Sequence, residues 1–229
     1  MTKYKHIFFD LDRTLWDYDA CAHATMRELQ RRHPEISGVD TRLLNTTYEK
    51  HSELGWEQYR RGTIKKADMR MKRFRDTLLE LGVNNDILAD TLSAEFIELC
   101  PSMPYLVNGA RELLEYLRPK YSLHILTNGF NDIQFRKMRS SNIEKYFERV
   151  ITSDTIGYVK PGKEIFHAAL SSVRAVKDST IMIGDDYPVD ILGAMGYGID
   201  QIWLNLNDTV PEKKPTFEIK KLHEIYSIL

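Results

Sequence analysis

Two carboxylates separated by one residue follow the first apolar segment of the chain. Asp10 and Asp12 come after Ile7-Phe8-Phe9, and Thr14 repeats the spacing with a hydroxyl. Carboxylates this close together can supply a nucleophile and a proton donor, or they can share a hard metal ion. A charged strand end is the simpler explanation, since Asp-x-Asp-x-Thr arises by chance in roughly several per cent of chains of this length. The motif therefore indicates a site only in combination with others.

Three later segments carry groups that would complement these acids. Residues 126–129 (Leu-Thr-Asn-Gly) provide a hydroxyl, an amide and a flexible backbone, and residues 159–161 (Val-Lys-Pro) place a lysine before a helix that proline can begin. Three acids follow further on, at Asp185, Asp186 and Asp190. Each segment alone can be explained as a turn, a solvated charge or a pair of helix caps. All four in this order, after four apolar segments, favour a single site.

The elements that must position these segments alternate between strands and helices. Short β-branched and aromatic runs predict strands at residues 4–10, 122–127, 149–153, 180–183 and 199–204. Helices are predicted between them, at residues 109–117, 133–141, 164–173 and 189–195. This alternation is typical of an α/β fold with a doubly wound, Rossmann-like parallel sheet, whose carboxyl edge carries ligands.

An all-helical insert interrupts this pattern. Residues 17–102 show almost no strand signal and predict about four helices, at 20–32, 43–58, roughly 64–81 and 86–100. The third helix is predicted from apolar residues that recur at helical spacing, namely Ile64, Ala67, Met71, Phe74, Leu78 and Leu81. We therefore expect a core domain of residues 1–16 and 103–229, with a helical-bundle domain at residues 17–102.

Composition narrows the class of protein. The 229 residues are 42% hydrophobic and 28% charged, with a formal net charge of −1. This balance argues against a nucleic-acid polymer as partner, and no apolar run reaches the roughly 18 residues that a membrane span needs. Cys21 and Cys100 form no metal-binding pair and no disulfide framework, so the sequence favours the cytoplasm and reduced thiols. The oligomeric state is not indicated.

Taken together, the four segments resemble the haloacid dehalogenase-like (HAD) superfamily, and the insert resembles its helical C1 cap. Within it, the chain resembles the pyrimidine 5′-nucleotidase branch, on Leu126 to Phe130, Val159 to Pro161 with Ile165-Phe166, and Asp190 to Gly193 with Trp203-Leu204-Asn205. The superfamily motifs match as Asp10-x-Asp12-x-Thr14, Thr127, Lys160-Pro161, and Gly184-Asp185 with Asp190.

The resemblance implies a phosphatase that works through an aspartyl-phosphate. Asp10 would be the nucleophile, and Asp12 would protonate the leaving oxygen and later take a proton from water. Lys160 would offset charge on the phosphoryl oxygens, and Thr127 would donate a hydrogen bond to one of them. Substrate binding would then involve the groups of two segments, namely Thr127, Asn128, Gly129 and Lys160.

A divalent cation is expected among the acids, because several carboxylates would otherwise repel one another. An oxygen-rich site for a phosphate substrate suits Mg²⁺. By resemblance its ligands would be the Asp10 carboxylate, the Asp12 backbone carbonyl and the Asp185 carboxylate. Asp190 is expected to orient Lys160 or a water on the metal, whereas Asp186 could equally be a helix-start acid.

The substrate is expected to be a nucleoside 5′-monophosphate. Trp16, Asp17 and Tyr18 could line the mouth of the site, while aromatic and basic residues of the insert could contact a base or an anion. Another phosphoester (phosphoglycolate or a sugar phosphate), a phosphomutase and a non-enzymatic phosphate-binding protein are the alternatives. The insert residues in question are Trp56, Tyr59, Arg60 and Arg61, all of which could instead be structural or solvated.

Overall fold

The computed structural model describes residues 3–229, and their contacts divide the chain into two compact units. One unit combines Met1–Tyr18 with Pro104–Leu229, and the other is Asp19–Met103. The first is an α/β unit and the second contains only helices. No helix within residues 3–229 is long and apolar enough to cross a membrane.

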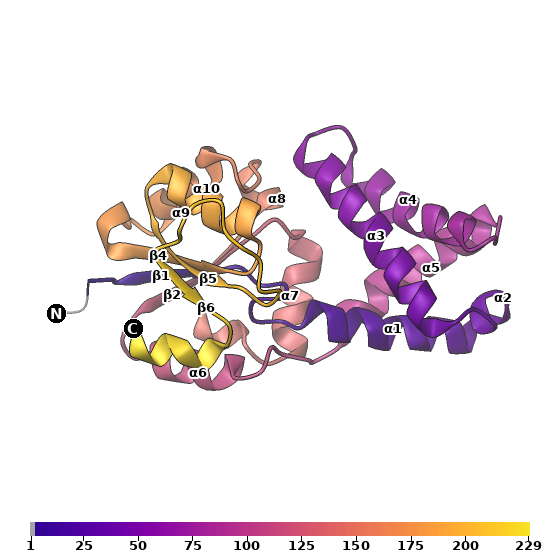
Figure 1. Cartoon of the computed structure of the whole chain (residues 1–229), viewed down its shortest axis with the longest axis horizontal. Helices are drawn as coiled ribbons and strands as arrows, with labels where there is room; N and C mark the ends of the chain where they lie inside the picture. Colours follow the sequence, from indigo (N-terminus) through magenta and orange to yellow (C-terminus); the bar gives the residue numbers. More distant parts are fainter. Residues whose placement is uncertain (1–2) are drawn as a thin grey trace. The chain divides into compact units, whose positions relative to one another are not determined.

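A six-stranded, fully parallel sheet forms the centre of the α/β unit (Figure 1). Its spatial order is β3-β2-β1-β4-β5-β6, which confirms the doubly wound fold predicted from the sequence. Parallel strands covered on both faces are continuously apolar, and β4 accordingly has every residue buried. The strands are β1 (His6–Phe9), β2 (Ser122–Thr127), β3 (Arg149–Thr152), β4 (Thr180–Gly184), β5 (Asp200–Leu204) and β6 (Phe217–Ile219).

Five of these strands lie where the sequence predicts them, within a few residues at each end. The sixth, β6, is missing from the prediction because three residues are too few to show a periodic pattern. Its backbone pairs with β5 through Ile202 and Phe217, so it becomes a strand only by joining an existing edge.

Helices cover both faces of the sheet. Figure 1 shows α9 and α10 on one side of the strands and α6 with the C-terminal η5 on the other. The strand order reverses between β1 and β4, which is where ligands bind in such sheets. The helical segments of this unit are α6 (Ala110–Leu117), α7 (Asn131–Ser140), η2 (Glu144–Tyr146), α8 (Ser153–Ile156), α9 (Lys163–Ser172), η3 (Lys177–Ser179), η4 (Tyr187–Ile191), α10 (Leu192–Tyr197) and η5 (Leu222–Ser227).

The helix predicted at residues 189–195 is divided into two pieces. A π-helical turn, Tyr187–Ile191, comes first, and α10 follows directly. The Asp186 side chain caps the turn by accepting from the Val189 N–H at 3.1 Å, and Pro188 occupies its first turn. A π turn widens the helix locally, and here it carries Asp190 into the interior.

The helical unit has four long helices and two short helical segments. Asp40 and Asn85 cap two of them by accepting from the N–H three residues on. Its core includes an aromatic cluster of Tyr48, Phe74 and Phe96, with ring centroids 4.9–5.5 Å apart. The helical segments are α1 (Tyr18–Arg32), α2 (Pro34–Ser37), α3 (Thr41–Arg60), α4 (Lys66–Glu80), α5 (Asp86–Leu99) and η1 (Cys100–Ser102).

The buried face of α4 differs from the predicted apolar repeat. Met69 is fully buried, whereas Met71, a member of the repeat, is 38% exposed. The buried face of α4 is therefore rotated relative to the line of the repeat. Arg73 explains the shift, because its guanidinium lies 5.3–5.9 Å from three aromatic ring centres and takes a buried position that a polarity pattern assigns to solvent.

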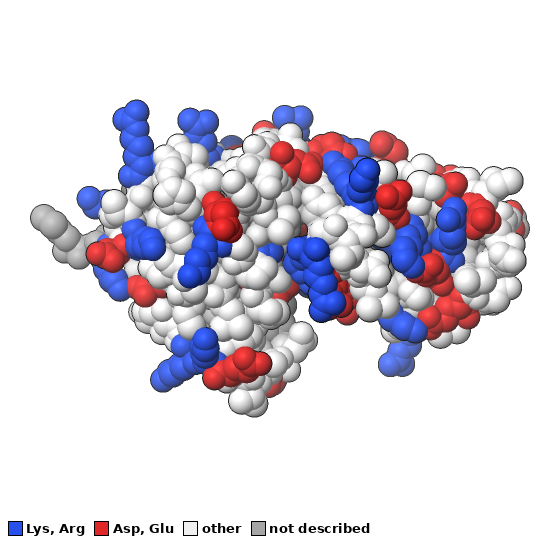
Figure 2. Space-filling view, turned by 90° about the horizontal axis from the view of Figure 1, so that it is seen from above, with Lys and Arg blue, Asp and Glu red and all other residues white. Residues whose placement is uncertain are grey.

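Charged side chains of both signs are interspersed on the face of the molecule that Figure 2 presents. This surface agrees with the near-zero net charge of the chain.

Candidate active site

The carboxyl ends of three neighbouring strands bring the predicted site segments together. Phe9 is in register with Ile125 of β2 and Ile183 of β4, so the residues that follow these strands emerge at one edge. The Asp10 N–H continues the ladder by donating to the Ile183 carbonyl at 2.9 Å. Asp10 and Asp185 therefore leave adjacent strands side by side.

A tight loop after β1 turns Thr14 back towards β4. The N–H groups of Leu15 and Trp16 both donate to the Leu11 carbonyl, at 3.0 and 2.9 Å. Arg13 takes a positive φ of 60° inside this loop, and its guanidinium lies 4.8 Å from the Tyr18 ring centre. The loop thereby places Thr14 in the interior.

The buried Thr14 hydroxyl donates to Asp185 Oδ1 at 2.8 Å. The loop after β4 is held from its other side, where the Trp203 indole N–H donates to the Asp185 carbonyl at 3.0 Å. Asp185 is thus fixed through both its side chain and its backbone.

Lys160 is buried at the centre of the site. Its ammonium donates to Asp10 Oδ1 at 2.7 Å, to Asp190 Oδ1 at 2.6 Å and to the Leu126 carbonyl at 2.8 Å. Burial alone would lower the pKa of Lys160, but the two carboxylates outweigh it and raise that pKa, so the lysine is charged. All three donors of the ammonium are engaged.

Asn128 holds the backbone of Lys160. Its amide nitrogen donates to the Lys160 carbonyl at 2.9 Å, and its amide oxygen accepts from the Lys160 N–H at 2.7 Å. The side chain of Asn128, which the sequence predicts as a substrate contact, is therefore engaged within the protein.

Thr127 keeps its hydroxyl hydrogen for a ligand. Its oxygen accepts from the Gly129 N–H at 3.0 Å and from Gln134 Nε2 at 2.9 Å, which uses both lone pairs. Gly129 is required here because a Cβ at this position would lie 2.1 Å from Gln134 Nε2. The Thr127 hydroxyl therefore still has its hydrogen to donate.

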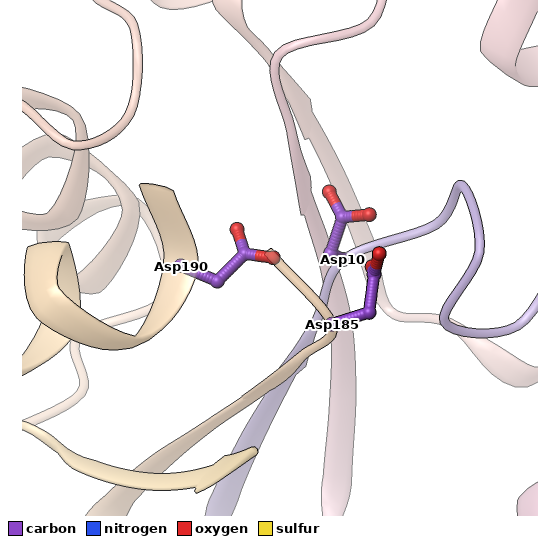
Figure 3. Close-up of side chains that lie close together, drawn as sticks. All are labelled: Asp10, Asp185 and Asp190. Atoms are coloured by element: carbon purple, nitrogen blue, oxygen red, sulfur yellow. The ribbon is translucent and has the colours of Figure 1, made fainter. Parts of the chain in front are cut away.

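Three carboxylates converge at this edge of the sheet (Figure 3). Asp10, Asp185 and Asp190 each offer an oxygen, and these oxygens lie within 4.8 Å of one another. Gly184 allows the close approach, since a Cβ there would be 2.3 Å from Asp190 Oδ2. Within residues 3–229, this Oδ2 atom is buried and has no hydrogen-bond partner.

Electrostatics favour a cation in this cluster. Burial, together with the Asp10 charge, raises the pKa of Asp185 to about 7. Burial also raises the pKa values of Asp10 and Asp190, although Lys160 opposes this in both cases. Hard oxygen donors, excess negative charge and an unpartnered buried oxygen all fit Mg²⁺.

Two polar residues on α7 also reach the site, and the sequence analysis missed both. Gln134 bonds Thr127, and Lys137 bonds the Asp12 carboxylate at 2.6 Å. The available signal was their spacing of three residues on a helix that directly follows the Thr127 segment. Trp56 and Tyr59 of α3 form an edge-to-face pair within the helical unit, with ring centroids 5.8 Å apart.

Comparison with known proteins identifies relatives along the whole chain. The family model of haloacid dehalogenase-like hydrolases matches residues 4–198. The pyrimidine 5′-nucleotidase YjjG of Escherichia coli is 30% identical over 230 residues, which cover 99% of this chain and 98% of that protein. HAD-hydrolase YfnB of Bacillus subtilis is 29% identical over 233 residues, which cover 100% of this chain and 97% of that protein.

Solved structures show the same fold. The Bacillus subtilis YfnB structure, described as bound to magnesium, has a TM-score of 0.90 at 27% identity and covers 100% of this chain and 99% of that one. A dehalogenase structure has a TM-score of 0.78 at 18% identity, covering 100% of this chain and 98% of the other. At that identity the similarity concerns the fold alone.

Proposed function

The chain belongs to the haloacid dehalogenase-like hydrolases and is a phosphoric monoester hydrolase, and we propose that it removes phosphate from nucleoside 5′-monophosphates in a Mg²⁺-dependent reaction. The observation that carries the proposal is the convergence of Asp10, Lys160 and Asp185 at the switch point of a chain with near full-length similarity to pyrimidine 5′-nucleotidases.

Asp10 and Asp12 divide the proposed chemistry between them. A carboxylate oxygen of Asp10 attacks phosphorus while the bond to the leaving oxygen breaks, and Asp12 gives that oxygen a proton. Water then attacks the aspartyl-phosphate and gives its proton back to Asp12, which releases inorganic phosphate and restores Asp10.

Lys160 and Thr127 bind the negative charge that accumulates on the phosphoryl oxygens. Lys160 already contacts Asp10 at 2.7 Å, so its positive charge is fixed beside the point of attack. The Thr127 hydroxyl hydrogen remains for a phosphoryl oxygen because both of its lone pairs are occupied. These fixed charges and dipoles need no reorganisation during the reaction.

The acidic cluster is the proposed metal site. Asp10, the Asp12 backbone carbonyl and Asp185 would hold Mg²⁺, which would offset charge between the nucleophile and the phosphate. Asp190 lies in the same cluster, but its Oδ1 accepts from Lys160 at 2.6 Å. We therefore propose that Asp190 orients the Lys160 side chain and does not bind the metal.

A second candidate substrate class is the small sugar phosphates. Glyceraldehyde 3-phosphate phosphatase of Pyrococcus abyssi is 32% identical over 205 residues, which cover 87% of this chain and 80% of that protein. The nucleotide proposal is preferred because the nucleotidase similarity covers 99% of this chain, against 87% for the glyceraldehyde 3-phosphate phosphatase. A dehalogenase is disfavoured, since the acid at Asp12 serves a leaving oxygen and halide release needs no proton.

The test is phosphate release from a panel of phosphoesters, measured with and without Mg²⁺. Uridine and thymidine 5′-monophosphates should give the highest kcat/KM, above glyceraldehyde 3-phosphate and phosphoglycolate, and chelation should abolish every activity. A higher kcat/KM for a sugar phosphate would overturn the nucleotide assignment, and undiminished activity in excess EDTA would overturn the metal assignment. Conversion of a sugar phosphate to an isomer without phosphate release would indicate a phosphomutase.

We also propose the cytoplasm as the place of action. The chain has only two cysteines, Cys21 and Cys100, which are too few for the disulfide framework typical of small secreted proteins.

A further inference from the structure

The helix that follows the Thr127 segment directs two side chains at the carboxylate of Asp12. Lys137 Nζ lies 2.6 Å from Asp12 Oδ1 and 2.8 Å from Oδ2. Gln134 Nε2 donates to the same Oδ2 at 3.1 Å. Both residues belong to α7 and are one turn apart, so a single rigid element holds both oxygens of this carboxylate.

The Lys137 ammonium is largely shielded from water at this position. Its side chain is only 7% exposed, and the ammonium lies 4.6 Å from the Trp16 ring centre and 5.9 Å from that of Tyr18. Aromatic faces and the Asp12 carboxylate thus replace water around the charge. Buried ion pairs of this kind add little net stability, so a role in folding alone explains the arrangement poorly.

Gln134 donates to two site residues although its own amide oxygen is left without a hydrogen bond. It is fully buried, and its two amide hydrogens go to Asp12 and Thr127. Its Oε1 atom has no partner among the residues that the structure describes, which is unfavourable for a buried acceptor. Gly129, which lacks a Cβ that would clash with Gln134, accommodates this side chain.

We propose that Lys137 and Gln134 are positioning residues, which hold the Asp12 carboxyl group where it can pass a proton to the leaving oxygen and later receive one from water. The inference rests on the proposed function of Asp12. In the first step the Asp12 O–H bond breaks and a bond forms between that proton and the leaving oxygen. In the second step the proton of the attacking water returns to Asp12. Lys137 and Gln134 keep their own protons throughout.

This role predicts a dependence on the leaving group. The alkoxide of a nucleoside and the phenolate of phenyl phosphate are poor leaving groups, so their departure needs the proton of Asp12. p-Nitrophenolate is a good leaving group and departs without one. Because kcat/KM reports the steps up to departure of the leaving group, a misplaced Asp12 should lower it for the first class and spare the second.

The experiment compares Lys137→Met, Lys137→Arg and Gln134→Leu with the unchanged full chain at saturating Mg²⁺. For Lys137→Met we expect kcat/KM to fall about 10- to 100-fold with uridine 5′-monophosphate and phenyl phosphate, but less than about threefold with p-nitrophenyl phosphate. Gln134→Leu should show a smaller difference between the two classes of substrate, in the same direction. Lys137→Arg should retain part of the kcat/KM that Lys137→Met loses.

The second step supplies an independent readout. With p-nitrophenyl phosphate, Lys137→Met should release a burst of about one p-nitrophenolate per enzyme before a slower steady state, because water attack is impaired for every substrate. Lys145→Met is a matched control, since Lys145 is an exposed lysine of η2 whose ammonium lies 5.2 Å from the Tyr146 ring centre. It should leave both readouts unchanged.

Equal losses with all three substrates, or a lower melting temperature as the only effect, would overturn the inference. Asp12→Asn separates this failure from failure of the proposed function. If Asp12→Asn shows the leaving-group split and Lys137→Met does not, the positioning role alone is wrong. If Asp12→Asn itself affects all substrates equally, Asp12 is not the proton donor. The proposed role of Asp12 and the positioning role of Lys137 and Gln134 then both fail.

Discussion

The hydroxyl of Thr14 donates to the carboxylate of Asp185 at 2.8 Å, although 171 positions separate the two residues in the chain. The bond joins the loop after β1 to the loop after β4, the two strands on either side of the switch point. It therefore links two of the sequence motifs into one structural unit, with Thr14 fixing the orientation of a proposed metal ligand.

Thr14→Val should weaken the use of Mg²⁺. Valine keeps the shape of the buried side chain but leaves Asp185 without its donor, and such outer contacts typically contribute about 10- to 100-fold to metal affinity. We expect the Mg²⁺ concentration for half-maximal activity to rise by about tenfold, with kcat at saturation largely retained. Thr25→Val, which removes a buried hydroxyl that bonds the Cys21 carbonyl in the helical unit, should not change the Mg²⁺ titration.

Asp10→Asn should abolish turnover without unfolding the protein. The amide preserves the shape but cannot attack phosphorus, and loss of a nucleophile lowers kcat by on the order of 10⁵ to 10⁶. The measurement is kcat with p-nitrophenyl phosphate alongside the melting temperature. The exposed Asp178→Asn should behave like the unchanged chain. Turnover by Asp10→Asn within tenfold of normal would contradict a covalent aspartyl-phosphate at this residue.

Lys160→Met should destabilise the fold as well as stop the reaction. It leaves the Asp10 and Asp190 carboxylates buried without their positive partner, and breaking a buried ion pair in this way costs about 3–5 kcal/mol. Urea unfolding measures the loss. Adding Asp190→Asn to Lys160→Met should restore part of the stability but no activity. If the double variant is less stable than the single one, charge balance is not what Lys160 provides.

His124 should make the α/β unit less stable in mild acid. Burial against Phe8 and the neighbouring His6 lower the pKa of His124 to about 4, whereas an unfolded histidine titrates near 6.5. The unfolded chain therefore gains a proton first as the pH falls from about 6.5 to about 4, and unfolding becomes easier by up to about 3 kcal/mol.

The check compares the free energy of unfolding at pH 7.5 and pH 5.0. His124→Phe should reduce the difference between the two values, because phenylalanine fills the same position and does not titrate. The exposed His223→Gln is the control and should retain the full difference. Identical pH dependence in all three proteins would exclude His124 as its source.

Trp56→Ala should change the ranking of substrates more than the rate of hydrolysis. All four motifs lie in the α/β unit, so we expect the helical unit to read the leaving group, and stacking of a base on an aromatic ring contributes about 1–3 kcal/mol. The ratio of kcat/KM for uridine 5′-monophosphate to that for p-nitrophenyl phosphate should fall about tenfold or more. Tyr226→Ala disrupts another aromatic pair, with Tyr116, and should leave this ratio unchanged. Equal losses for both substrates would assign Trp56 a structural role.

The sequence by itself determined the class of fold and the chemistry-bearing segments. Apolar strands alternating with helices are local patterns, and an acid, a hydroxyl or a lysine after each strand can be read without knowing the contacts. Parallel strands all carry these residues to the same edge, which is why Asp10, Thr127 and Asp185 could be placed together in advance.

Tertiary structure alone decided which of these groups touch. The Lys137–Asp12 contact joins residues 125 positions apart, and it depends on which face of α7 turns inward. Likewise Asn128 could have faced a ligand, and only the backbone of the Lys160 loop, packed against it, engages its amide. Periodicity gives the existence of a helix, but the angle of its buried face follows from packing, as Met69 and Met71 show. Contacts between distant segments arise from close packing of the whole chain, which no local pattern encodes.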